Sequence, residues 1–408
     1  MTIAAYAAIP RNTHWGVVSV VVGSGIVTAM QVGKAAIATP LLQTDLSLDL
    51  AAAGWLTGIF AVLGLIGGIP AGTLVARAGD RRMLIFGLGV IALGTVIGAM
   101  APGFPVLLAS RALEGFGFLL VTVAGPAILH RVVQLGQRDL AFALWSCFMP
   151  AGMALAMLAG PLFSDWRTLW WGNAGLAAAA IVAGLAIVPA APARVSVSWR
   201  SAASDALRVL TSREPVLLAV CFASYSLMFF ALFSFLPVLL MEQMEIAHGT
   251  AGLLSSVATG ANIIGNLAAG YLLARGTSRS ALLSGAYLIM GLTGIGIFLQ
   301  VFGGTPTLTL CILFSGVGGL IPATLISSAS LVAPSAALAP VVIGLIMQGS
   351  NLGQVIGPVT IGGAIASYGW KAAAGIILIS GLIATIAVLV VSFSDEPTPK
   401  SPSEEANR

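Results

Sequence analysis

The sequence predicts an all-α membrane protein with about twelve transmembrane helices in two pseudo-symmetric halves of six. Charged residues make up only 8% of the 408 residues and apolar residues 58%, whereas a typical soluble domain is about 25% charged. The apolar residues fall into segments long enough to cross a bilayer, which takes roughly 20 residues each. Residues 71–84 also recur as residues 269–282, 198 positions later, with seven identical positions. A repeat placed between apolar segments indicates two halves built on one plan.

The expected membrane spans follow one another with short connections. In the first half they are residues 15–38, 51–74, 83–101, 105–129, 139–162 and 168–188. In the second half they are residues 215–240, 250–273, 281–302, 307–331, 339–366 and 371–393. The first span is longer than the roughly 7–15-residue core of a signal peptide, so we expect it to be retained. The spans predict an N-terminal six-helix bundle at 1–188 and a C-terminal six-helix bundle at 215–393.

Two polar segments fall outside the predicted bundles. Residues 189–214 form a predicted cytoplasmic linker in which apolar residues from Trp199 to Leu210 recur at helical spacing among arginines. This pattern fits a short amphipathic helix on the inner leaflet, or alternatively a polar tether. Residues 394–408, rich in Pro, Ser and acidic side chains, predict a disordered cytoplasmic tail.

Basic residues lie in alternate loops of this arrangement. The opposite loops hold only Arg167 and Lys371. By the positive-inside rule the basic loops face the cytoplasm, which predicts a multi-pass inner-membrane protein with both termini inside. Because the basic residues are scattered over short loops, we expect no nucleic-acid partner. The basic loops contain Arg11, Arg77, Arg81, Arg82, Arg131, Arg138, Arg194, Arg200, Arg208, Arg213, Arg275, Arg279, Lys400 and Arg408.

The repeated segment resembles the signature loop between helices 2 and 3 of the major facilitator superfamily. The first copy matches that pattern at Gly72, Leu74, Arg77, Gly79, Arg81 and Leu84, and the second at Gly270, Leu272, Arg275, Arg279 and Leu282. Ala76 stands where the family has an acid, and Asp80 is the available substitute. In the family this loop holds helix ends of the two halves together during alternating access. The resemblance therefore implies conformational gating by Gly72, Arg77, Asp80 and Arg81.

Two further segments are similar to motifs of the same superfamily. The stretch Arg111-Ala-Leu-Glu-Gly-Phe-Gly is similar to its intramembrane motif on helix 4. In the predicted eleventh helix, glycines up to Gly362 have the spacing of its antiporter motif, which normally lies on helix 5, and this implies gating roles for Gly353, Gly357 and Pro358. Two stretches resemble the cyanate and nitroimidazole branch, although drug–proton antiporters have similar ones. They are LWSCFMPAGMALAM and Phe235-Leu236-Pro237, which ends the predicted seventh helix.

Three charged residues lie well inside the predicted spans: Lys34, Arg111 and Glu114. A charge at the membrane centre costs about 2.5–3.5 kcal/mol, so each needs a partner or a water-filled cavity. One hypothesis is that Lys34 or Arg111 attracts an anionic substrate and Glu114 carries a coupled proton. The other is that Arg111 and Glu114, which are i, i+3 neighbours, form a permanent pair while Lys34 extends outward.

Uncharged polar residues supply the remaining candidates for substrate binding. They are Gln31, Tyr225, Asn262, Gln348 and Asn351. The alternative for each amide is a hydrogen bond to a neighbouring helix.

Other classes of function lack the residues that they require. His14, His130 and His248 have no metal-ligand spacing, and Gly33-Lys34 lacks the other residues of a phosphate loop. We therefore expect no enzyme activity, cofactor or metal, and a monomer surrounded by membrane lipids. The predicted function is secondary transport of a small solute, favouring an organic or inorganic anion, by proton symport. A proton-driven drug or metabolite efflux antiporter is the alternative, and a non-transporting membrane sensor or assembly factor is a third possibility.

Overall fold

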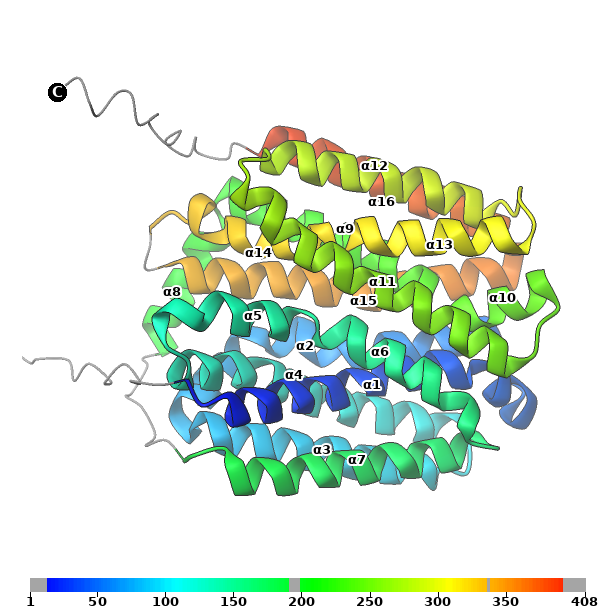
Figure 1. Ribbon diagram of the computed structural model, residues 1–408, viewed down its shortest axis with the longest axis horizontal. Coiled ribbons are helices and arrows are strands. Elements are labelled where there is room, and N and C mark those ends of the chain that lie inside the picture. The colour runs from blue at the N-terminus through cyan, green and yellow to red at the C-terminus, as the bar shows by residue number, and fades with distance from the viewer. Residues whose placement is uncertain (1–12, 191–198, 336–337, 392–408) are drawn as a thin grey trace, which may run out of the picture.

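The computed structural model describes residues 13–190, 199–335 and 338–391, and every regular element within these ranges is helical. The long helices run along one common axis, with the N-terminal half of the chain below and the C-terminal half above in the view of Figure 1. In these ranges, eleven helical segments are long and apolar enough to cross a membrane when Gly304–Val332 is counted as one, and the bent pair Leu140–Ser146 and Phe148–Leu162 supplies a twelfth. The predicted all-α membrane fold is confirmed.

The N-terminal half begins and ends at the same end of the bundle. Its helices are α1 (Trp15–Leu46), α2 (Leu50–Ala78), α3 (Asp80–Ala99), α4 (Phe104–Val132), α5 (Arg138–Ser146), α6 (Phe148–Ala159) and α7 (Trp166–Ile187), with short 3₁₀ turns η1 (Leu135–Gln137) and η2 (Gly160–Leu162). Asp49 and Asp165 start α2 and α7 as N-caps, because their carboxylates accept the backbone N–H groups of Ala52 and Thr168.

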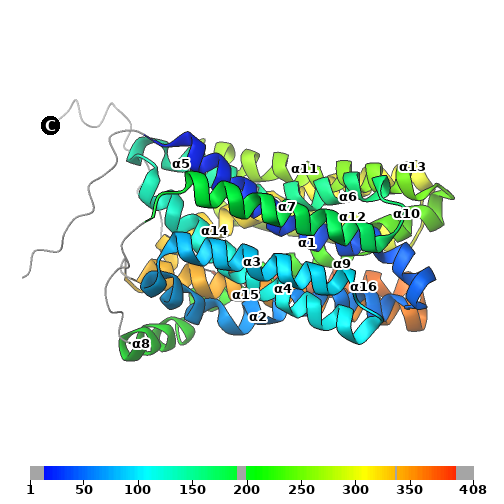
Figure 2. The ribbon, with the colours of Figure 1, turned by 90° about the horizontal axis from the view of Figure 1, so that it is seen from below.

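The second half repeats this plan after the short helix α8 (Trp199–Leu210), which lies at the edge of the bundle in Figure 2 and contacts α9 and α15. Its helices are α9 (Arg213–Phe233), α10 (Leu236–Met244), α11 (His248–Ala274), α12 (Arg279–Phe298), α13 (Gly304–Gly318), α14 (Leu320–Val332), α15 (Ala339–Tyr368) and α16 (Lys371–Val390). Within residues 189–214 the structure thus contains a helix, on which Leu207 and Leu210 are exposed.

Three predicted spans are interrupted, and in each of them a helix ends four residues before a proline. Proline has no N–H to bond the carbonyl four residues before it, so a helix tends to end there. Each of the predicted spans 139–162, 215–240 and 307–331 is divided between two helices, and Phe235-Leu236-Pro237 starts a new helix instead of ending one. The helix ends and their prolines are Ser146 and Pro150, Phe233 and Pro237, and Gly318 and Pro322.

The two halves meet along two pairs of helices. On one side α2 packs on α15 through glycines: a methyl group on Gly54 would overlap the Pro358 carbonyl oxygen. On the other side α11 packs on α6, where a Cβ added to Gly252 would lie 2.7 Å from the Met157 carbonyl oxygen. Such close backbone approach through small residues is typical of helix packing in membranes.

The two ends of the bundle differ in charge. We call the end with the α2–α3, α4–α5 and α11–α12 connections the basic end, since Arg81, Arg131 and Arg279 lie there, and the other the far end. At the far end His248 Nε2 lies 2.7 Å from the Ile37 carbonyl oxygen and joins α11 to α1 across the halves. The halves therefore touch at the far end on this side of the molecule.

Candidate functional site

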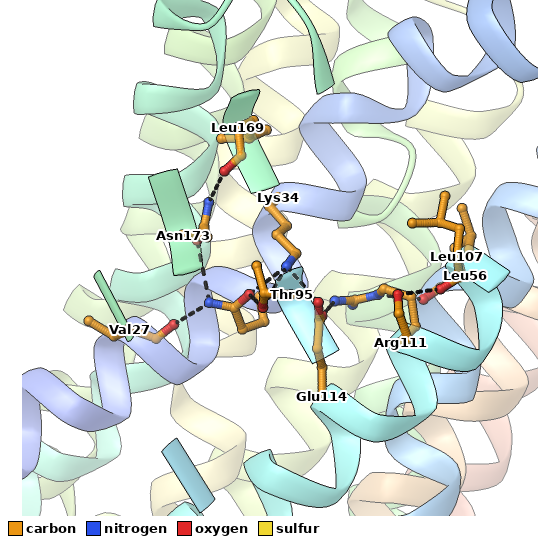
Figure 3. A network of polar contacts seen from close by, with 11 residues as sticks. Val27, Lys34, Leu56, Thr95, Leu107, Arg111, Glu114, Leu169 and Asn173 are labelled. Atoms are coloured by element: carbon orange, nitrogen blue, oxygen red, sulfur yellow. Dashed lines mark hydrogen bonds and ion pairs between the residues drawn. The ribbon is translucent and has the colours of Figure 1, made fainter. Parts of the chain in front are cut away.

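The three intramembrane charges form one cluster inside the N-terminal half. Lys34 Nζ of α1 lies 2.8 Å from Glu114 Oε1 of α4, and the Arg111 guanidinium is paired with the other carboxylate oxygen of Glu114. All three side chains are 0% exposed. Figure 3 shows Glu114 between the two cations, which approach from opposite sides. We call Lys34, Arg111 and Glu114 the charge cluster.

Neutral polar groups surround the lysine side of the cluster. Lys34 Nζ also donates to Gln31 Oε1 at 2.6 Å and Thr95 Oγ1 at 3.3 Å, and it lies 4.6 Å from the centroid of the Trp170 ring. Gln31 Nε2 lies 3.4 Å from Asn173 Oδ1 of α7. These contacts connect α1, α3, α4 and α7 around the ammonium group. Protein acceptors thus take the place of water at most of its N–H donors.

The arginine side of the cluster contacts α2. Arg111 Nε donates to the Leu56 carbonyl oxygen at 3.1 Å, and the guanidinium lies 4.6 Å from the centroid of the Phe60 ring. Arg111 Nη2 is buried and has no hydrogen-bond partner among the described residues. The cluster therefore contains two cations, one carboxylate and one buried donor without an acceptor.

All these partners of the charge cluster come from the N-terminal half. The structure brings Lys34, Arg111 and Glu114 together, and Lys34 does not extend outward as the structural alternative required, because its ammonium is fully buried on Glu114. The pairing of Arg111 with Glu114 does agree with that alternative.

Tyr225 and Asn262 lie in a neutral polar network of the second half. Asn262 Nδ2 donates to the Tyr225 hydroxyl at 3.1 Å and to the Ser315 carbonyl oxygen at 3.0 Å. Asn266 Nδ2 donates to Asn262 Oδ1 at 2.8 Å. Among the described residues no hydrogen bond connects this network to the charge cluster.

Gln348 and Asn351 occupy a third place, the α2–α15 contact. Gln348 Nε2 lies 3.3 Å from the Leu65 carbonyl oxygen across the halves, and a Cβ on Gly64 would lie 2.7 Å from Asn351 Oδ1. The seven predicted binding residues thus divide among the charge cluster, the neutral network and the contact between halves.

The predicted gating residues of α15 face two different partners. Methyl groups on Gly353 and Gly357 would crowd the backbone of α9 in the same half, at Ala223 and Leu227. The carbonyl of Pro358 instead meets Gly54 of α2 in the other half. Helix α15 is therefore packed by backbone contact on both sides.

In the first copy of the repeated loop, Asp80 forms an ion pair inside the N-terminal half. Arg131 of α4 donates to both Asp80 oxygens, at 2.8 Å and 3.1 Å, and also to the Pro189 carbonyl oxygen at 3.1 Å. Arg81 Nη2 donates to the Leu185 carbonyl oxygen at 2.6 Å. These bonds join the ends of α3, α4 and α7. Gly72 and Arg77 lie in α2, and their side-chain surroundings fall outside the described residues.

Sequence reasoning missed two matching contacts at the far end. In the first half Asp45, near the end of α1, accepts from Trp166 Nε1 at 2.8 Å and Arg167 Nη1 at 2.7 Å. In the second half Glu242 of α10 accepts from Trp370 Nε1 at 2.7 Å. The signal was available, because Trp-Arg and Trp-Lys precede the sixth span of each half, at 166–167 and 370–371. Sequence reasoning also missed three residues around the charge cluster, Thr95, Trp170 and Asn173, of which Asn173 alone stood out as an amide in an apolar span.

Comparison with known proteins gives relatives among membrane carriers. A 3-(3-hydroxy-phenyl)propionate transporter of Escherichia coli strain K12 is 26% identical over 247 residues, covering 58% of this chain and 59% of the relative. A tetracenomycin C resistance and export protein of Streptomyces glaucescens is 25% identical over 181 residues, covering 44% of this chain and 34% of the relative. A multidrug efflux pump of Mycolicibacterium smegmatis is 28% identical over 154 residues, covering 38% of this chain and 30% of the relative. The chain thus spans less than two thirds of each of these relatives.

Structure and family comparisons cover most of the chain. The crystal structure of a bacterial homolog to the human lysosomal transporter Spinster, in an inward-facing and occupied conformation, matches with a TM-score of 0.70 at 17% identity, covering 92% of this chain and 95% of that one. That likeness concerns the fold alone. The family profile of the Major Facilitator Superfamily matches residues 21–358 and 287–408. The chain belongs to the major facilitator superfamily.

Proposed function

We propose that this protein is a secondary active transporter that moves a small anion across the inner membrane by alternating access, coupled to protons. The observation that carries the proposal is the charge cluster, in which two fully buried cations share one carboxylate. Membership of the superfamily supports a transport function. Two six-helix halves packed along α2–α15 and α6–α11 support alternating access, which moves one half against the other.

Charge balance supports an anion as the substrate. With all three groups ionised, the charge cluster carries one excess positive charge, and an unbalanced charge inside a membrane is costly. Arg111 Nη2 is a buried donor with no partner among the described residues, so a carboxylate or similar group would find both charge and a hydrogen bond there. A cationic substrate would increase the imbalance.

The position of Glu114 supports coupling to protons. It is the one negative charge of the cluster, and both Lys34 and Arg111 are paired with it. A proton on Glu114 weakens both ion pairs and leaves two cations for an incoming anion. One proton and one monovalent anion would then be carried together, which is symport.

Helix α2 supplies a path from the charge cluster to the contact between halves. Its Leu56 carbonyl accepts from Arg111, and two residues earlier Gly54 packs on Pro358 of α15. All cluster side chains are closed to solvent here, so substrate entry requires a change in packing around Arg111. Any shift of α2 in that change acts directly on the α2–α15 contact.

Efflux of an apolar or cationic compound is the second candidate. Two relatives are named for export or efflux, and buried aromatic rings follow one another along α9 from Phe222 through Tyr225 and Phe229 to Phe233, with centroids 4.5–5.8 Å apart. Such a row offers stacking surface for a flat apolar molecule.

We also propose that the basic end faces the cytoplasm and that the protein works as a monomer with both termini inside. Arg81, Arg131 and Arg279 support this orientation through the positive-inside rule. Fusion of a periplasm-active reporter and a cytoplasm-active reporter to each terminus tests it: only the cytoplasmic reporter should be active.

The main experiment starts from purified protein and a thermal-shift screen of small carboxylates, inorganic anions and apolar cations, because a bound ligand raises stability by mass action. Hits are then tested for uptake into liposomes under a pH gradient. We expect Arg111→Gln and Lys34→Gln each to lower uptake at least about tenfold, which is about 1.4 kcal/mol, while Arg208→Gln at the basic end keeps the wild-type rate. Wild-type uptake by both cluster variants would contradict the anion proposal.

The double variant Lys34→Gln/Glu114→Gln isolates the coupling role, because it removes one charge of each sign and keeps the net charge. We expect it to exchange labelled substrate across the membrane without accumulating it under a pH gradient. Accumulation at the wild-type level would exclude Glu114 as the coupling acid. Export of apolar cations without anion uptake would favour the efflux candidate, and absence of exchange for every hit would favour a non-transporting role.

A further inference from the structure

A groove opens between the two halves near the basic end, on the side where α6 and α11 meet. It has a volume of about 670 Å³ and lies between α5 of the first half and α11 and α14 of the second. It lies nearer the basic end than the close contact of Gly252 with Met157. Its walls include Leu140, Leu267, Gly270, Tyr271, Arg279 and Ser327.

The groove opens onto the apolar outer surface of the bundle. Leu140 is 55% exposed, Leu267 51% and Tyr271 57%. In a protein whose long helices are apolar enough to span a membrane, exposed leucines on such helices face acyl chains. The groove is therefore accessible to lipid as well as from the basic end.

Polar groups are concentrated at the basic end of the groove. Among the lining residues that the structure describes, Arg279 is the charged one, and Ser327 adds a hydroxyl. Arg275, directly after α11, lies with its guanidinium 4.4 Å from the centroid of the Tyr271 ring, so a second cation lies beside the same wall. Apolar walls with arginines at one end match an amphipathic anion, because basic pockets between membrane helices bind anionic lipid headgroups.

The corresponding region of the first half provides a contrast. A cavity of about 170 Å³ lies between α2 and α4 beside the first copy of the repeated segment, and its lining, which includes Ala71, Leu74 and Leu119, is entirely apolar. The groove beside the second copy of the repeat thus contains an arginine, whereas this cavity beside the first copy is lined by apolar residues.

We infer that the groove between α5, α11 and α14 binds one anionic phospholipid, with an acyl chain along Leu140 and Leu267 and its phosphate at Arg279. The inference does not depend on what the protein transports. A lipid seated there stabilises the present arrangement of α5, α11 and α14 over one in which the groove is closed.

Native mass spectrometry of the full-length protein tests this inference, with phosphatidylglycerol and phosphatidylcholine added separately in detergent. We expect wild-type protein to retain one phosphatidylglycerol at energies that remove phosphatidylcholine. Arg279→Gln should lower this retention at least tenfold, whereas Arg213→Gln, a cation at the same end but outside the groove lining, should not change it. Equal retention of the two lipids, or equal retention by wild type and Arg279→Gln, would overturn the inference.

A second pair of variants tests the acyl-chain part of the groove. A Cβ on Gly270 would have no neighbour within 4 Å, so Gly270→Leu can fold with its side chain filling the groove. Gly285 of α12 is equally open and outside the lining, which makes Gly285→Leu the matched control. We expect loss of phosphatidylglycerol only in Gly270→Leu. Unchanged retention in Gly270→Leu, or equal thermal protection of wild type by inorganic phosphate and phosphatidylglycerol, would show that no acyl chain occupies the groove.

Discussion

The two halves share one helical plan but hold their cores together by different means. The first half buries an ion cluster, in which Glu114 neutralises one of two cations. The polar network of the second half, as far as the structure describes it, consists of neutral groups. In it Asn262 is bonded to Tyr225 and Ser315. In the second half a row of glycines on α15 supports the packing, because Gly349, Gly353 and Gly357 each meet the backbone of α9.

The difference indicates how the halves divide their work. A buried ion cluster changes its energy sharply when one proton or one anion is added, because charges interact strongly at low dielectric constant. Amide networks and glycine contacts respond weakly to charge and depend mainly on shape. We therefore expect the first half to sense ions and the second half to act as a close-packed support. Four substitutions test this comparison, in order of expected effect.

The largest effect is expected for Glu114→Gln. This change leaves Lys34 and Arg111 buried without a counter-charge, and removal of one partner from a buried pair costs about 3–5 kcal/mol. The free energy of unfolding in detergent measures it. Glu245→Gln, at an exposed far-end position, is the control and should change that value by less than about 0.5 kcal/mol. Equal stability of Glu114→Gln and wild type would remove the basis for a charged first half.

The next effect is expected for Gly353→Leu in the second half. A side chain here would overlap the Ala223 carbonyl of α9, and overpacking of a close contact costs about 1–3 kcal/mol. Gly363→Leu on the same helix has no neighbour within 4 Å of its Cβ and serves as the control. If both variants melt at the wild-type temperature, backbone contact between α9 and α15 does not support this half.

A smaller effect is expected for Asn262→Ala. It removes two donated hydrogen bonds and leaves the Tyr225 hydroxyl without this partner, a loss of about 1–2 kcal/mol for an interhelical amide. Thr309→Ala, which alters an exposed bond within one helix, should be near neutral. A loss as large as that of Glu114→Gln would mean that charge is not what distinguishes the halves.

The smallest effect is expected for Asp165→Ala at the start of α7, a cap that the corresponding helix α16 lacks. Loss of an N-cap costs about 1 kcal/mol. The backbone N–H of Thr168 lowers the pKa of Asp165, so its contribution is present above the unfolded pKa of about 3.9 and is lost as the pH falls through the folded value. The stability difference between wild type and Asp165→Ala should therefore shrink between pH 7 and pH 3. A difference that grows in acid would contradict this sign.

Hydropathy and charge pattern predicted the helical membrane fold, because a bilayer constrains both composition and segment length. The same patterns could not predict the interruptions near Pro150, Pro237 and Pro322, since Pro40, Pro126 and Pro358 have similar surroundings in sequence and their helices continue. Whether a proline interrupts a helix depends on tertiary contacts that hydropathy does not contain.

The candidate site was predictable only in part. Lys34, Arg111 and Glu114 stood out because charges are rare in such segments, and the structure brings them together. The partners Thr95, Trp170 and Asn173 come from helices distant in sequence, and their side chains are common in membrane helices. Assignment to the cyanate and nitroimidazole branch, and the binding roles of Gln348 and Asn351, remain predictions.

The break between α5 and α6 has a practical consequence for studying movement. The two helices meet at an angle of 42°, and the residue between them is Cys147. Cys221 and Cys311 are fully buried, whereas Cys147 is partly exposed. A small membrane-permeant maleimide should therefore modify the unaltered protein at one position, and a fluorescent label there would report bending of this span without any engineered cysteine.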